Sequence, residues 1–158
     1  MKKKPYIIAF FFFMIDIISK QIITHIIDFK KSIQIINNFF YITHVHNTGA
    51  AWSILEDQRI LLLIISVFAL FLINKIINKD ELSQLESLSY GMIIGGIIGN
   101  LFDRILFGYV IDFLDFRLFG YNYPVFNLAD SFIVIGIIIM AIISIRKDRY
   151  ERNNSRRK

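Results

Sequence analysis

Residues 125–145 read "VFNLADSFIVIGIIIMAIISI", an apolar run with one carboxylate, Asp130, near its start. About 20 mostly apolar residues are enough to cross the hydrocarbon core of a bilayer as a helix. An ionisable side chain inside such a segment costs on the order of 3 kcal/mol, so its presence calls for a partner or a function. This stretch therefore predicts a membrane-spanning helix with a functional group near one end.

Three further apolar blocks indicate a membrane protein. The 158 residues are 55% hydrophobic with a mean hydropathy of +0.54, whereas soluble domains are typically about 45–50% apolar. We expect an all-α polytopic membrane protein, a single integral membrane domain over residues 1–158, with four transmembrane helices and a small β-rich segment at the outer surface. No small-residue cleavage site follows the first block, which predicts a retained span rather than a cleaved signal peptide. The expected spans cover about residues 5–27, 60–77, 88–107 and 124–145.

Lysine and arginine are unevenly distributed over the segments between these spans. If the N-terminus is cytoplasmic, twelve of the 18 basic residues lie inside, two lie within spans at Lys20 and Arg104, and four lie outside, at Lys30, Lys31, Arg59 and Arg117. Cytoplasmic loops carry the excess of basic residues, so we expect both termini in the cytoplasm and residues 28–59 and 108–123 outside. We interpret the basic C-terminal tail as a topology signal beside anionic lipid, not as a nucleic-acid site.

The first outer segment is rich in β-branched and aromatic residues. It contains "SIQIINNFFYITHVHNTGAAWSI", with turn-forming residues at Asn37 and Asn38 and again at 47–49, and this pattern predicts a small strand-and-turn unit. His44 and His46 would share one face of a strand. However, the chain has no cysteine and no further histidine at ligand spacing, so we expect no metal and no cofactor.

Polar side chains inside the apolar blocks recur at helical spacing. Asp16 and Lys20 are four residues apart, which predicts an ion pair on one helix face. With the expected orientation, the polar residues of the first, third and fourth spans and of the outer segments gather toward the outer boundary of the membrane. The residues concerned are Lys20, Asn47, Asn100, Asp103, Arg104, Asp112 and Asp130.

Plainer structural explanations exist for several of these residues. Asp103 with Arg104 could anchor a helix end, and Asn127 could cap the fourth helix. Small residues four apart favour close helix packing, and this is what we expect of the glycines at Gly91, Gly95 and Gly99.

Four carboxylates at the expected boundary remain as candidates for chemistry: Asp103, Asp112, Asp115 and Asp130. Two carboxyl groups close together in an apolar site share a proton, so that one can activate water and the other can protonate the leaving group. The sequence leaves open whether Asp112 or Asp103 is the partner of Asp130. Arg104 beside Asp103 favours permanent ionisation there, which favours Asp112. Of Asp112 and Asp115, only one can face the site if the segment is extended.

Four stretches of the chain resemble the bacterial lipoprotein signal peptidases (signal peptidase II). They occur in family order over nearly the whole chain, with the same four-span layout and no departure at the motif positions. The stretches are "DIISK" (16–20), "VHNTGAAWS" (45–53), "GGIIGNLFDR" through "GYVIDFLDF" (95–116), and "PVFNLADSFIVIG" (124–136).

The resemblance implies a membrane aspartic endopeptidase that removes signal peptides from prolipoproteins. It implies cleavage on the N-terminal side of a diacylglyceryl-modified cysteine, at the outer face of the bacterial cytoplasmic membrane, and inhibition by the cyclic peptide globomycin. It implies lipid-modified prolipoproteins and membrane lipid as partners, no nucleic acid, and a monomer. The implied catalytic pair is Asp112 of V-x-D-F and Asp130 of F-N-x-A-D. The implied supporting or substrate-binding residues are Asp16, Lys20, Asn47, Gly49, Asn100, Asp103, Arg104, Asn127 and Ala129.

Three other classes of protein are weighed against this one. A small proton-conducting transporter would place its charges near the bilayer midplane rather than at one boundary. A presenilin-type protease would carry G-x-G-D, which the sequence lacks. A non-enzymatic scaffold would need no clustered carboxylates.

Overall fold

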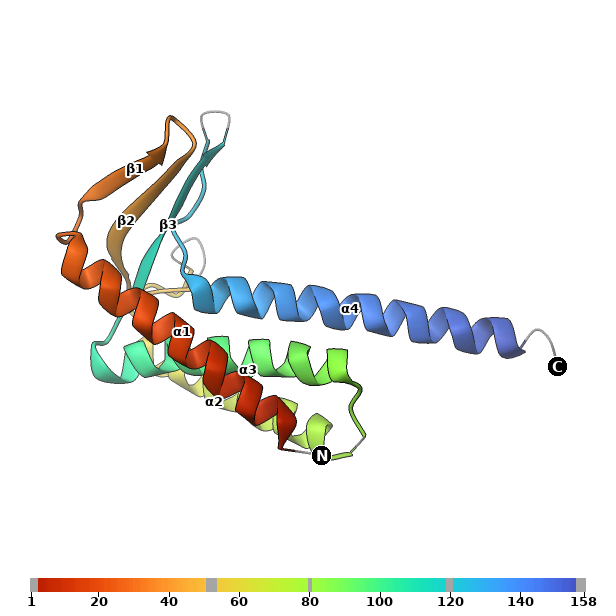
Figure 1. Ribbon diagram of the computed structural model, residues 1–158. Coiled ribbons are helices and arrows are strands. Elements are labelled where there is room, and N and C mark those ends of the chain that lie inside the picture. The colour runs from red at the N-terminus through yellow and green to blue at the C-terminus, as the bar shows by residue number, and fades with distance from the viewer. Residues whose placement is uncertain (1–2, 51–53, 80, 119–120, 156–158) are drawn as a thin grey trace.

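The computed structural model describes residues 3–50, 54–79, 81–118 and 121–155, and in these residues the chain forms four long helices and a small antiparallel sheet (Figure 1). All four helices are long and apolar enough to cross a membrane, which confirms the predicted fold class. The helices are α1 (Lys4–Ile26), α2 (Arg59–Lys79), α3 (Gln84–Leu106) and α4 (Leu128–Ser155). The strands are β1 (Ser32–Ile36), β2 (Phe40–Asn47), β3 (Val110–Leu118) and β4 (Tyr121–Asn122).

Two helices differ in extent from the apolar blocks that predict them. α3 begins at Gln84, where Ser83 and Glu86 form a reciprocal capping box before the apolar residues start. α4 begins at Leu128 because the preceding residues are extended and Phe126 bridges to Leu114 of β3. Its helical conformation continues past Ile145 into the basic tail, where charged residues of good helix propensity follow.

Glycines allow α3 to pack closely against both α1 and α4. A methyl group added at Gly91 or Gly95 would run into residues of α1, and one added at Gly99 would meet the carboxylate of Asp16. These three glycines therefore form the predicted packing stripe. Gly96, which is not part of that stripe, gives the same close approach to α4, because an added methyl group would meet the carbonyl oxygen of Ala129.

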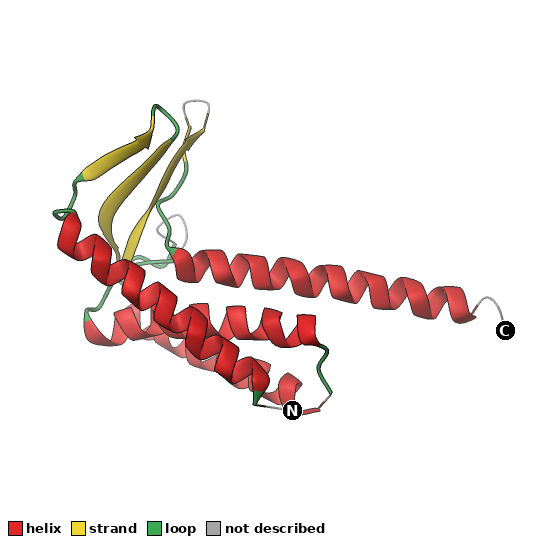
Figure 2. Cartoon of the chain, viewed as in Figure 1, coloured by secondary structure: helices red, strands yellow, loops and turns green. Residues whose placement is uncertain are grey.

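The sheet joins the two segments predicted to lie outside the membrane. Its strand order is β1-β2-β3-β4, with antiparallel pairing throughout. The sequence predicts strands only in the first segment, whereas the nine-residue β3 comes from the second segment and pairs with β2 in a register that sets Asp112 opposite Val45. Figure 2 shows the sheet standing at the end of the molecule where α1 ends and α4 begins. The start of β3 is therefore held beside the first turn of α4.

Candidate active site

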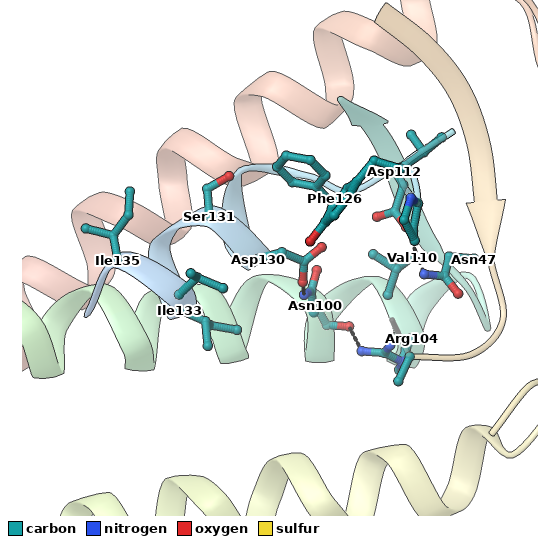
Figure 3. Close-up of a pocket in the computed structure, with 15 residues that line it drawn as sticks. Asn47, Asn100, Arg104, Val110, Asp112, Phe126, Asp130, Ser131, Ile133 and Ile135 are labelled. Atoms are coloured by element: carbon teal, nitrogen blue, oxygen red, sulfur yellow. Dashed lines mark hydrogen bonds between the residues drawn. The ribbon is translucent and has the colours of Figure 1, made fainter. Parts of the chain in front are cut away.

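Asp112 and Asp130 line the same cavity, although they come from different elements. The cavity has a volume of about 610 Å³ and lies between the start of β3, the C-terminal part of α3 and the first turns of α4. Figure 3 shows Asp112 entering from the strand and Asp130 from the helix. Asn47, Asn100 and Arg104 also line it. Five of the sequence-predicted residues thus meet at one place.

Asn127 connects the two aspartates. Its side-chain Nδ2 donates to Asp112 Oδ1 at 2.6 Å, while its Oδ1 accepts the backbone N–H of Asp130 at 3.0 Å. The carboxylate of Asp130 in turn accepts the backbone N–H of Asn127 at 3.3 Å. This reciprocal pattern is a capping box at the start of α4. Asn127 is therefore the helix cap that the sequence allows, and the same side chain also holds Asp112.

Each aspartate receives a further hydrogen bond from an asparagine of another element. Asn47, at the end of β2, donates to Asp112 Oδ2 at 2.8 Å, and Asn100 of α3 donates to Asp130 Oδ1 at 2.7 Å. The backbone N–H of Gly49 donates to Asn47 Oδ1, which fixes the orientation of that amide. Both carboxylates are consequently held by amide donors on more than one side.

Asp112 lies outside the helices and is almost fully buried. Burial raises the pKa of its carboxyl group from the ordinary 3.8, and the charge of Asp130 raises it further, to about 7. Hydrogen bonds from Asn47 and Asn127 and the charge of Lys20 act in the opposite direction. A carboxyl group that exchanges its proton near neutral pH is suited to acid–base chemistry.

Arg104 brings a cation to the edge of the cavity. Its Nη2 donates to the carbonyl oxygen of Gly49 at 2.7 Å, and its Nη1 lies 3.4 Å from the carbonyl oxygen of Asn100. Its Nε has no hydrogen-bond partner among the described residues, although the side chain is buried. Arg104 thus holds the turn after β2 against α3.

Asp16, Lys20 and Asp103 form a buried cluster behind the cavity rather than in its wall. Lys20 Nζ lies 2.7 Å from Asp16 Oδ2, which confirms the predicted ion pair within α1. It also lies 2.9 Å from Asp103 Oδ2. The sequence suggests Arg104 as the neighbouring cation of Asp103, but in the structure Lys20 is the ion-pair partner of Asp103 and Arg104 binds Gly49 instead.

Other residues considered from the sequence lie elsewhere. Asp115 accepts the hydroxyl of Thr43 at 3.1 Å and pairs with Arg117 at 3.3 Å, and it does not line the cavity. His44 Nδ1 lies 2.8 Å from the carbonyl oxygen of Ile27. The ring of His46 stacks between those of Phe29 and Tyr109. Residues 51–53 of the motif that contains Asn47 and Gly49 lie outside the described residues.

The sequence reasoning missed the apolar part of the cavity wall. Ile133, Val134 and Ile135 of α4 form this part, together with Val110, Phe126 and residues 123–125. Ser131 of α4 also lines the cavity. Their signal in the sequence is helical spacing: Ile133 and Val134 lie three and four residues after Asp130, on the same helix face. The cavity therefore combines a polar end, where the aspartates lie, with an apolar wall along α4.

Comparison with known proteins identifies the family. The model of a family described as signal peptidase (SPase) II matches residues 8–146. Two solved structures, each described as a bacterial membrane enzyme, are 35% identical to this chain. The match to the first covers 92% of this chain and 88% of the solved chain, with a TM-score of 0.83. The match to the second covers 91% of this chain and 93% of the solved chain, with a TM-score of 0.80.

The match decides between the classes of protein that the sequence leaves open. It favours a peptidase over a transporter or a scaffold, and with four membrane-capable helices it makes the chain a multi-pass membrane protein. The chain belongs to the signal peptidase II family, and it is an aspartic endopeptidase.

Proposed function

We propose that this enzyme removes signal peptides from diacylglyceryl-modified prolipoproteins, with Asp112 and Asp130 as the catalytic pair. Family membership supports cleavage of lipoprotein signal peptides. The observation that carries the assignment of the pair is that both aspartates line one cavity, while a buried asparagine, Asn127, is hydrogen-bonded to both of them. Asp103 is the weaker candidate because it is ion-paired with Lys20 and lies outside the cavity wall.

The proposed chemistry needs one proton on the pair. The ionised carboxylate takes a proton from water, and the resulting hydroxide adds to the scissile carbonyl carbon. The protonated carboxyl group donates its proton to the carbonyl oxygen, which gives a gem-diol. As the C–N bond breaks, the carboxyl group that took the proton from water gives it to the leaving amine nitrogen, and a gem-diol hydroxyl returns a proton to the other carboxylate. The pKa of Asp112 near 7, raised by burial and by the charge of Asp130, supports a pair that carries a single proton at neutral pH.

The shape of the cavity supports a lipid-linked peptide as substrate. The aspartates occupy its polar end, while Ile133, Val134 and Ile135 extend an apolar wall along a membrane-capable helix. A substrate with its scissile bond beside a diacylglyceryl cysteine could place the peptide at the polar end and acyl chains along that wall. We propose that the cut falls on the N-terminal side of this cysteine.

The distribution of charge supports a site at the outer face of a bacterial cytoplasmic membrane. Arg146, Lys147, Arg149 and Arg152 lie in the part of α4 far from the sheet, and the first turn of α1 also lies away from the sheet (Figure 1). The positive-inside tendency then favours a cytoplasmic location for that end and an outer location for the sheet and the cavity.

The test is cleavage by purified wild type and by the variants Asp112→Asn, Asp130→Asn and Asp103→Asn. The substrate is a diacylglyceryl-modified prolipoprotein in detergent, and the readout is the gel shift of the product. We expect wild type and Asp103→Asn to cut, and the first two variants to remain folded without cutting. Removing one member of an aspartic pair abolishes the proton shuttle, so the loss should exceed about 10³-fold.

Each other outcome contradicts a defined part of the proposal. Cleavage by Asp112→Asn, with loss in Asp103→Asn and Asp130→Asn, would move the pair to Asp103 and Asp130. An uncut lipid-modified precursor with wild type would refute the proposed substrate. Equal cleavage of precursors with and without the diacylglyceryl group would refute the role of the lipid.

A further inference from the structure

We propose that Asp16 and Asp103 are positioning residues that fix the separation of the two catalytic carboxylates, with Lys20 joining them into one buried frame. The inference rests on the proposed pair of Asp112 and Asp130. Neither Asp16 nor Asp103 lines the cavity, so any effect on cleavage would be exerted through other groups.

The first contact of this frame is with the strand that carries Asp112. Asp103 Oδ2 accepts the backbone N–H of Ile111 at 3.2 Å. Ile111 immediately precedes Asp112 in the chain. The carboxylate of Asp103 therefore ties the start of β3 to the outer end of α3, one residue from the catalytic group.

The second contact has the same form at the helix that carries Asp130. Asp16 Oδ1 accepts the backbone N–H of Ala129 at 2.9 Å, and Ala129 immediately precedes Asp130. This N–H belongs to the first turn of α4, where backbone donors have no partner within the helix. A carboxylate at this end also interacts favourably with the helix dipole.

Lys20 connects the two contacts. Its Nζ lies 2.7 Å from Asp16 Oδ2 and 2.9 Å from Asp103 Oδ2, and it donates to Asn100 Oδ1 at 3.1 Å. Asn100 in turn donates to Asp130. One ammonium group thus links the two anchoring carboxylates, Asp16 of α1 and Asp103 of α3, to each other and to the amide that donates to Asp130.

The burial of this cluster favours a geometric role over a simple gain in stability. Asp16, Lys20 and Asp103 are each at most 1% exposed. Removing charges from water is costly, and well-packed apolar side chains often stabilise a protein as much as a buried ion pair does. What apolar side chains could not supply is two acceptors for the N–H groups that precede the catalytic residues. Misplacement of a reacting group by about 1 Å can reduce the rate about 10²-fold.

Asp103 and Asp16 use their carboxylate oxygens differently, so replacing each with the isosteric asparagine has a different expected effect. Asp103 makes both of its contacts with one oxygen, Oδ2, so the amide oxygen of asparagine can keep both. Asp16 uses Oδ1 for Ala129 and Oδ2 for Lys20, so asparagine at that position can keep only one. Asp103→Ala removes both contacts of Asp103. Asp115→Ala is the matched control, because Asp115 is a buried carboxylate of β3 that touches neither anchored N–H.

The experiment measures kcat, KM and the fraction of folded protein for these variants. We expect Asp103→Ala to lower kcat about 10–100-fold with little change in KM, and Asp103→Asn to recover most of the loss. We expect Asp16→Asn to lose more kcat than Asp103→Asn. Asp115→Ala should keep the wild-type kcat per folded molecule.

The pH profile of kcat shows whether Asp103→Ala changes the position of the catalytic carboxylates or only reduces the amount of folded protein. Asp130 of α4, Lys20 of α1 and Arg104 of α3 are the charged groups that act on Asp112. If Asp103→Ala lets the carboxylates move apart, the charge of Asp130 raises the pKa of Asp112 less, and the alkaline limb moves to lower pH. Asp103→Asn removes the same charge, so the difference between the two variants isolates the change in position.

The outcomes distinguish failure of this inference from failure of the proposed pair. Wild-type kcat and pH profile per folded molecule in Asp103→Ala would overturn the positioning role, while the pair stands if Asp112→Asn and Asp130→Asn do not cut. Cleavage by either of those two variants would overturn the pair itself. If Asp103→Ala is not recovered folded, equal kcat values for Asp16→Asn and Asp103→Asn would overturn the positioning role.

Discussion

Helices α2 and α3 are similar in length, yet they differ in how much of their apolar surface is buried inside the protein. Only 11% of the apolar stretch of α2 is buried in the protein, against 56% of that of α3. α2 is the more apolar of the two, and α3 carries Asn100, Asp103 and Arg104. In a bilayer, apolar side chains can face lipid, while small and polar side chains favour contacts between helices. The less apolar helix is therefore the central one.

The central position of α3 explains how it can hold a site made from several elements. It packs against α1 and α4 through glycines on two sides, and its C-terminal end meets the start of β3. Changes on α3 should therefore affect the geometry of the aspartates, whereas changes on the lipid-facing side of α2 should not.

The largest effect in this comparison is expected from Gly96→Ala on α3. The added methyl group would meet the carbonyl oxygen of Ala129 and would approach Ile133 Cγ1 to 2.8 Å. A backbone carbonyl cannot turn aside, so α4 must shift and Asp130 must shift with it. We expect a loss of about 1–3 kcal/mol in the free energy of unfolding and a fall in kcat of about 10²-fold. Thermal unfolding and kinetics on the same preparation measure both.

Val67→Ile on α2 is the matched control, because it adds one methyl group to a side chain that is 57% exposed. It should leave both quantities unchanged. Equal losses in the two variants would contradict the view that the packing of α3 against α4, rather than the lipid-facing side of α2, positions Asp130.

A smaller effect is expected from pH. Burial and the charge of Asp130 raise the pKa of Asp112 to about 7, so the pair loses its shared proton as the pH rises through that value. In the mechanism we propose, the active form carries this proton, and kcat should therefore fall on the alkaline side of about pH 7. This alkaline limb, the fall of kcat with rising pH, is measured by a pH profile of kcat in detergent, with the folded fraction followed at each pH.

Asn47→Ala gives a more specific test of the pH prediction, because the direction in which it should shift the pKa of Asp112 is known. Asn47 donates to Asp112 at 2.8 Å, and this hydrogen bond lowers the pKa of Asp112. Without it the pKa should rise, and the alkaline limb should move to higher pH. A limb that stays in place or moves down would show that Asp112 is not the group that loses the proton.

The local features of this fold could be predicted from the sequence, and the long-range features could not. Apolar length predicts the four helices, and spacing predicts the Asp16–Lys20 pair and the glycine stripe, because each depends on neighbours within one or two turns. The pairing of Lys20 with Asp103, 83 residues later, depends on how α1 and α3 pack. For the same reason, residue spacing alone leaves open which of Asp103 and Asp112 lies beside Asp130, and in the structure Asp112 lines the cavity with Asp130.

The smallest effect is expected from Ile64→Ala on α2, where the side chain is 59% exposed. In water, truncating a large buried apolar side chain costs about 2–5 kcal/mol. Here lipid surrounds the side chain in both the folded helix bundle and the separated helices, so the hydrophobic term largely cancels. The free energy of unfolding should change by no more than about 0.5 kcal/mol, and kcat should not change. Reversible unfolding in detergent and the cleavage assay measure the two quantities. A clear loss of kcat with unchanged stability would mean that this face of α2 contacts the substrate. The difference between α2 and α3 would then be in what each helix binds, not in how much of each helix is buried.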